Sequence, residues 1–67
     1  MAAYQISYRN EDNELLTSET VFMRSLTMAK SSATSAASDM TDTITISDIG
    51  DKLLATKENG KWNDHCE

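Results

Sequence analysis

Proline is absent from this sequence of 67 residues, glycine occurs only twice and cysteine only once. A single cysteine excludes an intrachain disulfide, so the chain is not a disulfide-stapled scaffold. Uninterrupted apolar runs are short, such as Val21 to Met23, whereas a helix that crosses a bilayer needs about 20 apolar residues. Residues 1–30 do not combine a basic start, an apolar run and a small-residue cleavage site. We therefore expect a cytoplasmic protein with no membrane span.

Positive charge is also scarce, because six lysines and arginines stand against eleven aspartates and glutamates, for a net charge of −5. Affinity for nucleic-acid backbone comes from lysines and arginines that displace condensed counterions, so direct nucleic-acid binding is not expected. An acidic surface favours basic partners, including proteins that hold nucleic acid in a positive channel. Solubility alone also accounts for such a surface.

The length indicates one domain over residues 1–67, with a thin core. A chain of this size buries only about 60% of the surface that its unfolded form exposes. Net stability should then be a few kcal/mol, unless a second chain supplies further buried surface. Both a monomer and a homodimer are compatible with this expectation.

Apolar and polar residues alternate from Tyr4 to Tyr8, which predicts a strand with one apolar face. The run Arg9 to Glu14 is polar and rich in asparagine and aspartate, so it should turn the chain. Thr17, Thr20 and Val21 are β-branched and favour a second strand near Leu16 to Met23. These segments predict an antiparallel pair of strands.

A helix is predicted next, because Ser25 can cap its N-terminus and apolar residues then recur at spacings of three and four. This apolar stripe consists of Leu26, Ala29, Ala33, Ala36, Ala37 and Met40. Small alanines allow a helix backbone to approach a sheet closely. The opposite side is rich in serine and threonine, which gives modest intrinsic helicity. The helix should therefore need a sheet to pack on.

Three features predict the second half of the sheet. Thr43 to Ser47 has β-branched residues at four consecutive positions, and a turn at Asp48 to Asp51 separates it from a strand at Lys52 to Lys57. Asn59-Gly60 is a strong hairpin signal, after which Lys61-Trp62 can begin a short fifth strand. The predicted fold is α+β, a small antiparallel sheet in the order β-β-α-β-β with one helix on one face. Its predicted core is Ile6, Leu26, Ala29, Ala33, Ile44, Ile46 and Leu54.

No pattern of residues predicts catalysis, so we expect a non-enzymatic protein without metal or cofactor. His65 and Cys66 are adjacent, and neighbouring residues on a strand point to opposite faces, which makes a poor nucleophile–base pair. The acidic run Glu11 to Glu14 lacks the alternating oxygen ligands and central glycine of a calcium loop. Both glycines fall in predicted turns, and no phosphate-binding loop is present.

Trp62 and the lysines near the last hairpin allow two interpretations. Trp62 can close the core beside the hairpin or can anchor a partner. Lys52, Lys57 and Lys61 can contact a partner or can simply prevent unwanted pairing at the edge of the sheet.

Three segments together resemble a family of small phage and mobile-element proteins that includes the ninth type I-F anti-CRISPR family. They are Ser25 to Lys30 (SLTMAK), Thr43 to Ile46 (TITI) and Lys57 to Trp62 (KENGKW). With Tyr4 and Ile6 near the start and Cys66 near the end, the resemblance covers nearly the whole chain.

The resemblance implies a small antiparallel sheet that carries one helix. It also implies inhibition of an RNA-guided surveillance complex, by blocking the pairing of guide RNA with target DNA. Lys30, Lys57 and Lys61 match basic positions of the anti-CRISPR branch, and Ser31 and Ser35 occupy neighbouring helix positions. These five residues form the predicted partner-binding surface, and the expected partner is a protein or ribonucleoprotein.

A second hypothesis comes from the thin core and the solvated surface. They are also typical of a small self-associating protein from a mobile element, such as a gene cassette or prophage. An inhibitor should be a stable monomer with one exposed patch of mixed polar and apolar character, whereas a self-associating protein should bury an apolar face between identical chains.

Overall fold

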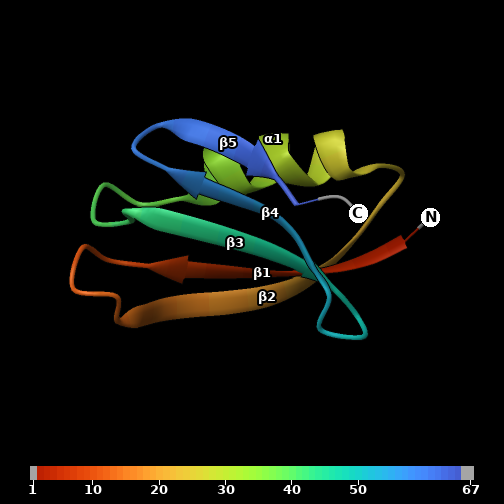
Figure 1. Ribbon diagram of the computed structural model, residues 1–67, viewed down its shortest axis with the longest axis horizontal. Coiled ribbons are helices and arrows are strands. Elements are labelled where there is room, and N and C mark those ends of the chain that lie inside the picture. Colours follow the sequence, from red (N-terminus) through yellow and green to blue (C-terminus); the bar gives the residue numbers. More distant parts are fainter. Residues whose placement is uncertain (1, 66–67) are drawn as a thin grey trace.

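A computed structural model describes residues 2–65, which form one five-stranded sheet and one helix. The elements in chain order are β1 (Ala2–Arg9), β2 (Leu15–Met23), α1 (Leu26–Ala36), β3 (Thr43–Asp48), β4 (Leu53–Glu58) and β5 (Lys61–Asp64). The sheet order is β2-β1-β3-β4-β5, and every neighbouring pair is antiparallel (Figure 1). The predicted α+β fold is therefore confirmed, with the fifth strand present.

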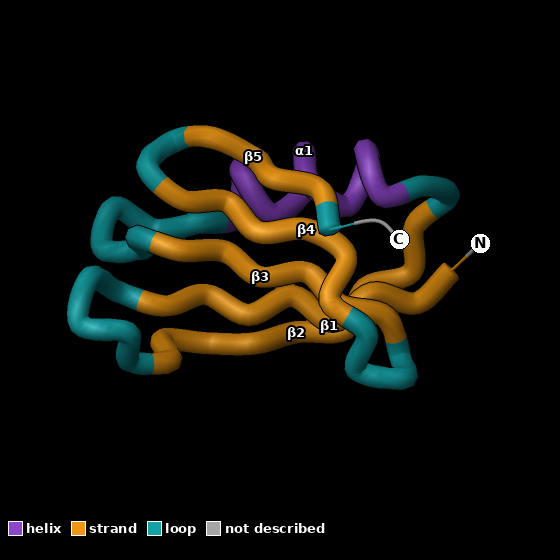
Figure 2. Tube along the Cα trace, in the orientation of Figure 1, coloured by secondary structure: helices purple, strands orange, loops and turns teal. Residues whose placement is uncertain are grey.

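The turns follow the predicted chemistry and join the strands at both ends of the sheet (Figure 2). In the β1–β2 turn, the Asn10 side-chain oxygen accepts hydrogen bonds from the backbone N–H groups of Asp12 and Glu14, at 2.9 and 3.0 Å. Asn13 has a positive φ of 63°, typical of a three-residue hairpin loop. Asn59 and Gly60 both have positive φ, as a two-residue type I′ turn requires.

The hydrophobic core lies between α1 and one face of the sheet. Its buried residues are Tyr4, Ile6, Tyr8, Ala29, Ala33, Ile44, Ile46 and Ala55. Five of the seven predicted core residues are among them, whereas Leu26 and Leu54 are only partly buried and pack at the margin. Ala29 and Ala33 are fully buried, so the helix backbone lies close to the sheet.

The helix is shorter than the apolar stripe predicted. Its last residue is Ala36, and Ala37 is extended, with φ −65° and ψ 136°. Met40 belongs to the loop that follows and is 70% exposed, so its assignment to the helical stripe was wrong. Serine and threonine have low helix propensity, and the chain does not continue the helix once Ala33 has completed the contact with the core.

Replacing Ser25 with alanine is expected to destabilise the protein by about 1 kcal/mol, because the side chain caps the helix. Ser25 Oγ accepts a hydrogen bond from the Met28 N–H at 3.3 Å, and Ser25 has the extended backbone of a capping residue. Chemical denaturation followed by circular dichroism measures the change. Ser35→Ala, at an exposed position within the helix, is the matched control and should leave the stability unchanged or slightly higher.

The opposite face of the sheet carries no layer in the described part of the chain, and its side chains are mostly small and polar. One row of cross-strand neighbours crosses all five strands and consists of Ser18, Ser7, Thr45, Thr56 and Asn63. Most of these uncharged side chains suit contact with water, whereas Thr56 is buried and is contacted by His65.

Candidate functional site

Trp62 lies on the helix-covered face of the sheet, at the edge formed by β5. Its direct neighbour across the ladder is Lys57, whose own neighbour on β3 is the buried Ile44. Cross-strand neighbours share a face in an antiparallel sheet, so Trp62 points toward α1. The ring is half-buried and packs against the margin of the core.

Two ammonium groups lie near the Trp62 ring. Lys30 Nζ, from α1, is 5.8 Å from the ring centroid, and Lys57 Nζ, from β4, is 6.0 Å from it. Cations at this distance are attracted by the negative face of the indole, by about 0.5–1 kcal/mol at exposed sites. The tryptophan therefore has a positive environment on a chain whose net charge is −5.

Lys30 also links the helix to β5, because its ammonium pairs with Asp64. The Lys30 side chain is 19% exposed and that of Asp64 is 58% exposed, so the pair is only partly shielded from water. Exposed ion pairs contribute about 1 kcal/mol or less. Within residues 2–65, no carboxylate forms such a pair with Lys57, which leaves its charge available to a partner.

A shallow, open hollow runs between α1 and Trp62. Its walls are formed by Thr27, Lys30, Ser31, Thr34, Ser35 and Trp62. Each helix residue among them lies three or four positions from at least one other, so they share one flank of α1. We call this area, together with Lys57, the Trp62 surface. It combines one large aromatic ring, two cations and several uncharged hydroxyl groups.

Four of the five predicted partner-binding residues gather here. Lys30, Ser31 and Ser35 line the hollow, and Lys57 lies beside the same tryptophan. Lys61 does not join them, because it is the cross-strand neighbour of Glu58 and precedes Trp62 on the strand. Successive strand residues point to opposite faces, so Lys61 projects from the uncovered side of the sheet.

Asp64 and the central place of Trp62 were not part of the predicted surface. The Asn59-Gly60 turn carries the signal that could have revealed them, because a two-residue loop aligns Glu58 with Lys61 and Lys57 with Trp62. The approach of Lys30 to β5 depends on how the helix packs across the sheet. Sequence periodicity does not determine that packing.

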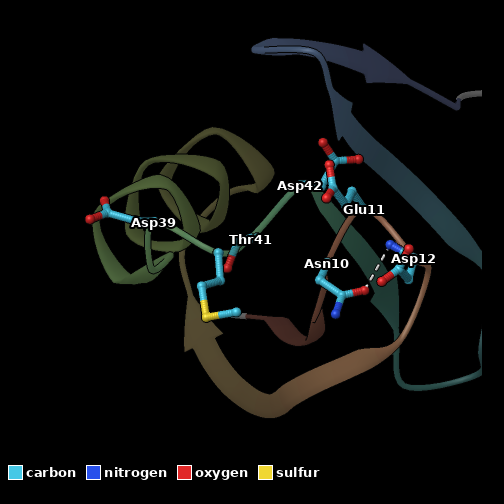
Figure 3. Close-up of a pocket in the computed structure, with 7 residues that line it drawn as sticks. Asn10, Glu11, Asp12, Asp39, Thr41 and Asp42 are labelled. Carbon is cyan, nitrogen blue, oxygen red and sulfur yellow. Dashed lines mark hydrogen bonds between the residues drawn. The ribbon is translucent and has the colours of Figure 1, made fainter.

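A second hollow is lined by acidic side chains, between the β1–β2 turn and the loop after α1 (Figure 3). Its lining residues are Asn10, Glu11, Asp12, Asp39, Met40, Thr41 and Asp42. The Asp39 carboxylate points away from those of Asp12 and Asp42 in Figure 3. Among residues 2–65, no three histidine, cysteine, aspartate or glutamate side chains are grouped so as to bind a metal ion.

His65 lies just after β5, where its Nε2 is 2.9 Å from Thr56 Oγ1 and its backbone N–H donates to the Leu54 carbonyl. The ring is thus placed beside the uncovered face of the sheet. Cys66, which was expected to form only a poor nucleophile–base pair with His65, lies outside the described residues.

Comparison with family models, curated proteins and solved structures reveals no match for this chain. In the part of the chain that the structure describes, α1 is too short and too polar to cross a membrane.

Proposed function

We propose that this protein is a non-enzymatic domain that binds another macromolecule through the Trp62 surface. The observation that supports this proposal is the convergence of Lys30 and Lys57 on one half-buried tryptophan, in a chain that is otherwise acidic. Tryptophan is among the residues most enriched at the energetic centres of protein interfaces. Lys57, which pairs with no carboxylate among residues 2–65, favours a partner segment that bears carboxylates or phosphates.

The surface is well suited to binding because its main anchor is already positioned. Trp62 is paired with Lys57 across the ladder, and the Lys30–Asp64 pair joins the helix to the same strand. Immobilising a side chain on binding costs roughly 0.5–1.5 kcal/mol, and much of this cost is avoided when the side chain is already ordered. The serine and threonine hydroxyls along α1 can donate or accept hydrogen bonds around the anchor.

The resemblance to the anti-CRISPR family suggests the kind of partner. A type I surveillance complex recognises its target through base pairing along a guide RNA, and pairing begins at a short seed. A small protein seated on the protein subunits beside the seed would stop pairing before it starts. This function needs no catalytic group, and the cationic Trp62 surface can meet carboxylates on the protein subunits of the complex.

Reversing the charge of Lys57 is expected to weaken binding to a purified type I surveillance complex by about tenfold or more, since close charge pairs at interfaces are worth about 1.5 kcal/mol upward. The measurement is a titration of Lys57→Glu at two salt concentrations. Lys61→Glu is the matched control, because it makes the same charge change on the other face of the same hairpin.

The control should bind within about threefold of the parent. Its melting temperature should fall only slightly, because the new carboxylate lies opposite Glu58 but both side chains are exposed. Equal loss of affinity in both variants would mean that net charge, not the Trp62 surface, governs binding. Absence of binding by the parent to such a complex would overturn the proposed partner.

A further inference from the structure

The two edges of the sheet are very different. β5 forms one edge with four residues and begins with Lys61, which fits the usual protection of an edge by short length and lysine. β2 forms the other edge with nine residues, of which only Val21 and Met23 are half-buried. Glu19 is the one charged residue in this strand, and the pairing with β1 is irregular only near its start. β2 therefore presents a long, nearly neutral edge.

The hydrogen bonding of the β1–β2 turn shows which backbone groups of β2 face outward. Asn10 donates its backbone N–H to the Glu14 carbonyl at 3.0 Å, so its backbone groups point toward β2. Backbone groups alternate in direction along a strand, so those of Tyr8, Ile6 and Tyr4 also point toward β2. The backbone groups of their neighbours on β2 point back toward β1; these neighbours are Thr17, Glu19 and Val21. The backbone N–H and C=O groups of the intervening residues, Ser18, Thr20 and Phe22, consequently point away from the sheet.

We propose that β2 pairs with β2 of a second copy of this chain, antiparallel and centred on Thr20. In this register Thr20 faces Thr20, while Ser18 faces Phe22, and each of these pairs can exchange both backbone hydrogen bonds. A register centred on Glu19 would place two carboxylates opposite each other, which is destabilising. A register centred on Ser18 would extend into the irregular segment near Leu16.

Several observations favour a second copy over a different partner. The edge presents no basic residue and only one carboxylate, and Glu19 already accepts a hydrogen bond from the Tyr8 hydroxyl at 2.9 Å. It therefore offers little to a charged segment but suits a strand of its own composition. In the Thr20-centred register the Glu19 side chain lies beside Val21 of the other copy, so its aliphatic part covers an apolar neighbour. The many carboxylates of the turns lie outside the paired segment.

The pairing would join two sheets into one continuous sheet with both helices on the same side, because the two-fold axis is perpendicular to the plane of the sheet. It would also shelter part of Phe22, which is 67% exposed. The Trp62 surface lies at the opposite edge and stays free. The pairing therefore departs from the monomer expected of an inhibitor but leaves its binding surface open, so either proposal can fail without the other.

The test is sedimentation equilibrium of the full chain across a dilution series. The parent should approach twice its monomer mass of 7.4 kDa as concentration rises. Thr20→Lys places two ammonium groups face to face at the centre of the pairing and should weaken association at least tenfold. Asn63→Lys adds the same charge at an exposed position on β5 and should associate like the parent.

Amide hydrogen exchange provides a second readout that does not depend on a variant. In concentrated parent protein, the outward amides of Ser18, Thr20 and Phe22 should exchange slowly and should lose this protection on dilution. The inward amides of Thr17 and Glu19 should be protected at both concentrations. A parent that stays monomeric, outward amides that exchange freely, or equal dissociation of both lysine variants would each overturn the proposal.

Discussion

Replacing Ile46 with alanine is expected to lower the free energy of unfolding by about 2–5 kcal/mol, which is most of the stability of a domain this small. Ile46 is fully buried in β3, between its cross-strand neighbours Ile6 and Ala55. Removing part of its side chain leaves a cavity under α1, and the alanines of the helix are too small to fill it. Urea denaturation followed by Trp62 fluorescence would measure the loss.

Ile49→Ala is the control for this experiment. Ile49 is 68% exposed in the turn between β3 and β4, so its truncation should change stability by about 0.5 kcal/mol at most. If the Ile46 variant unfolds at the same urea concentration as the parent and the Ile49 variant, then the buried face of β3 has been assigned incorrectly.

Stability is also expected to fall by about 2 kcal/mol as the pH rises from about 10 to about 12, because Tyr8 titrates in this range. The pKa of the phenol is raised from 10.0 to about 12, mainly by burial, and the hydrogen bond to Glu19 and the negative charge of that carboxylate contribute to this rise. Tyr8 is only 3% exposed. The folded protein therefore favours the neutral phenol more strongly than the unfolded chain does.

The sign follows from this preference. Below pH 10 the phenol is neutral in both states, and its contribution to stability is complete. Between pH 10 and 12 the unfolded chain releases the proton while the folded protein keeps it, so unfolding becomes progressively easier. Tyr8→Phe lacks this titration and should lose less stability over the same range. Identical pH profiles for parent and variant would show that another group causes the loss.

Local sequence patterns predicted most of the fold because they depend on short-range geometry. Alternation placed Tyr4, Ile6 and Tyr8 on one face, and the Asn59-Gly60 turn predicted the last hairpin. The helix start was predicted because capping is local to Ser25. The helix end was not, because apolar spacing alone extended the pattern to Met40, whereas the chain leaves the helix at Ala37.

The core assignment in β4 shows a second limit. Leu54 was expected in the core, but the buried neighbour of Ile46 is Ala55. The pairing register shifts between Ile46 and Ser47, so the face of each β4 residue depends on an irregularity that composition does not reveal. Leu54 consequently lies at the margin.

The parts of the candidate site that lie within one helix or one hairpin could be predicted from the sequence. The helical period places Lys30, Ser31 and Ser35 along one flank, and hairpin register places Lys57 beside Trp62. The position of that flank next to β5 results from the way α1 crosses the sheet, which is a tertiary property. Side chains alternate between the two faces of a strand, so the sequence could also have shown that Lys61, next to Trp62, lies on the other face from the remaining predicted residues.

The strand order has a consequence for how the chain can assemble. Three of the four neighbouring pairs are hairpins, so β1–β2 and β3–β4–β5 each form from residues that are close in sequence. Only β1 and β3 pair across a long separation, with Tyr4 facing Asp48. The entropy of closing a long loop is concentrated in this one step. Because α1 lies within this loop, packing α1 on the first hairpin would shorten the free chain that has to close before β3 can pair with β1.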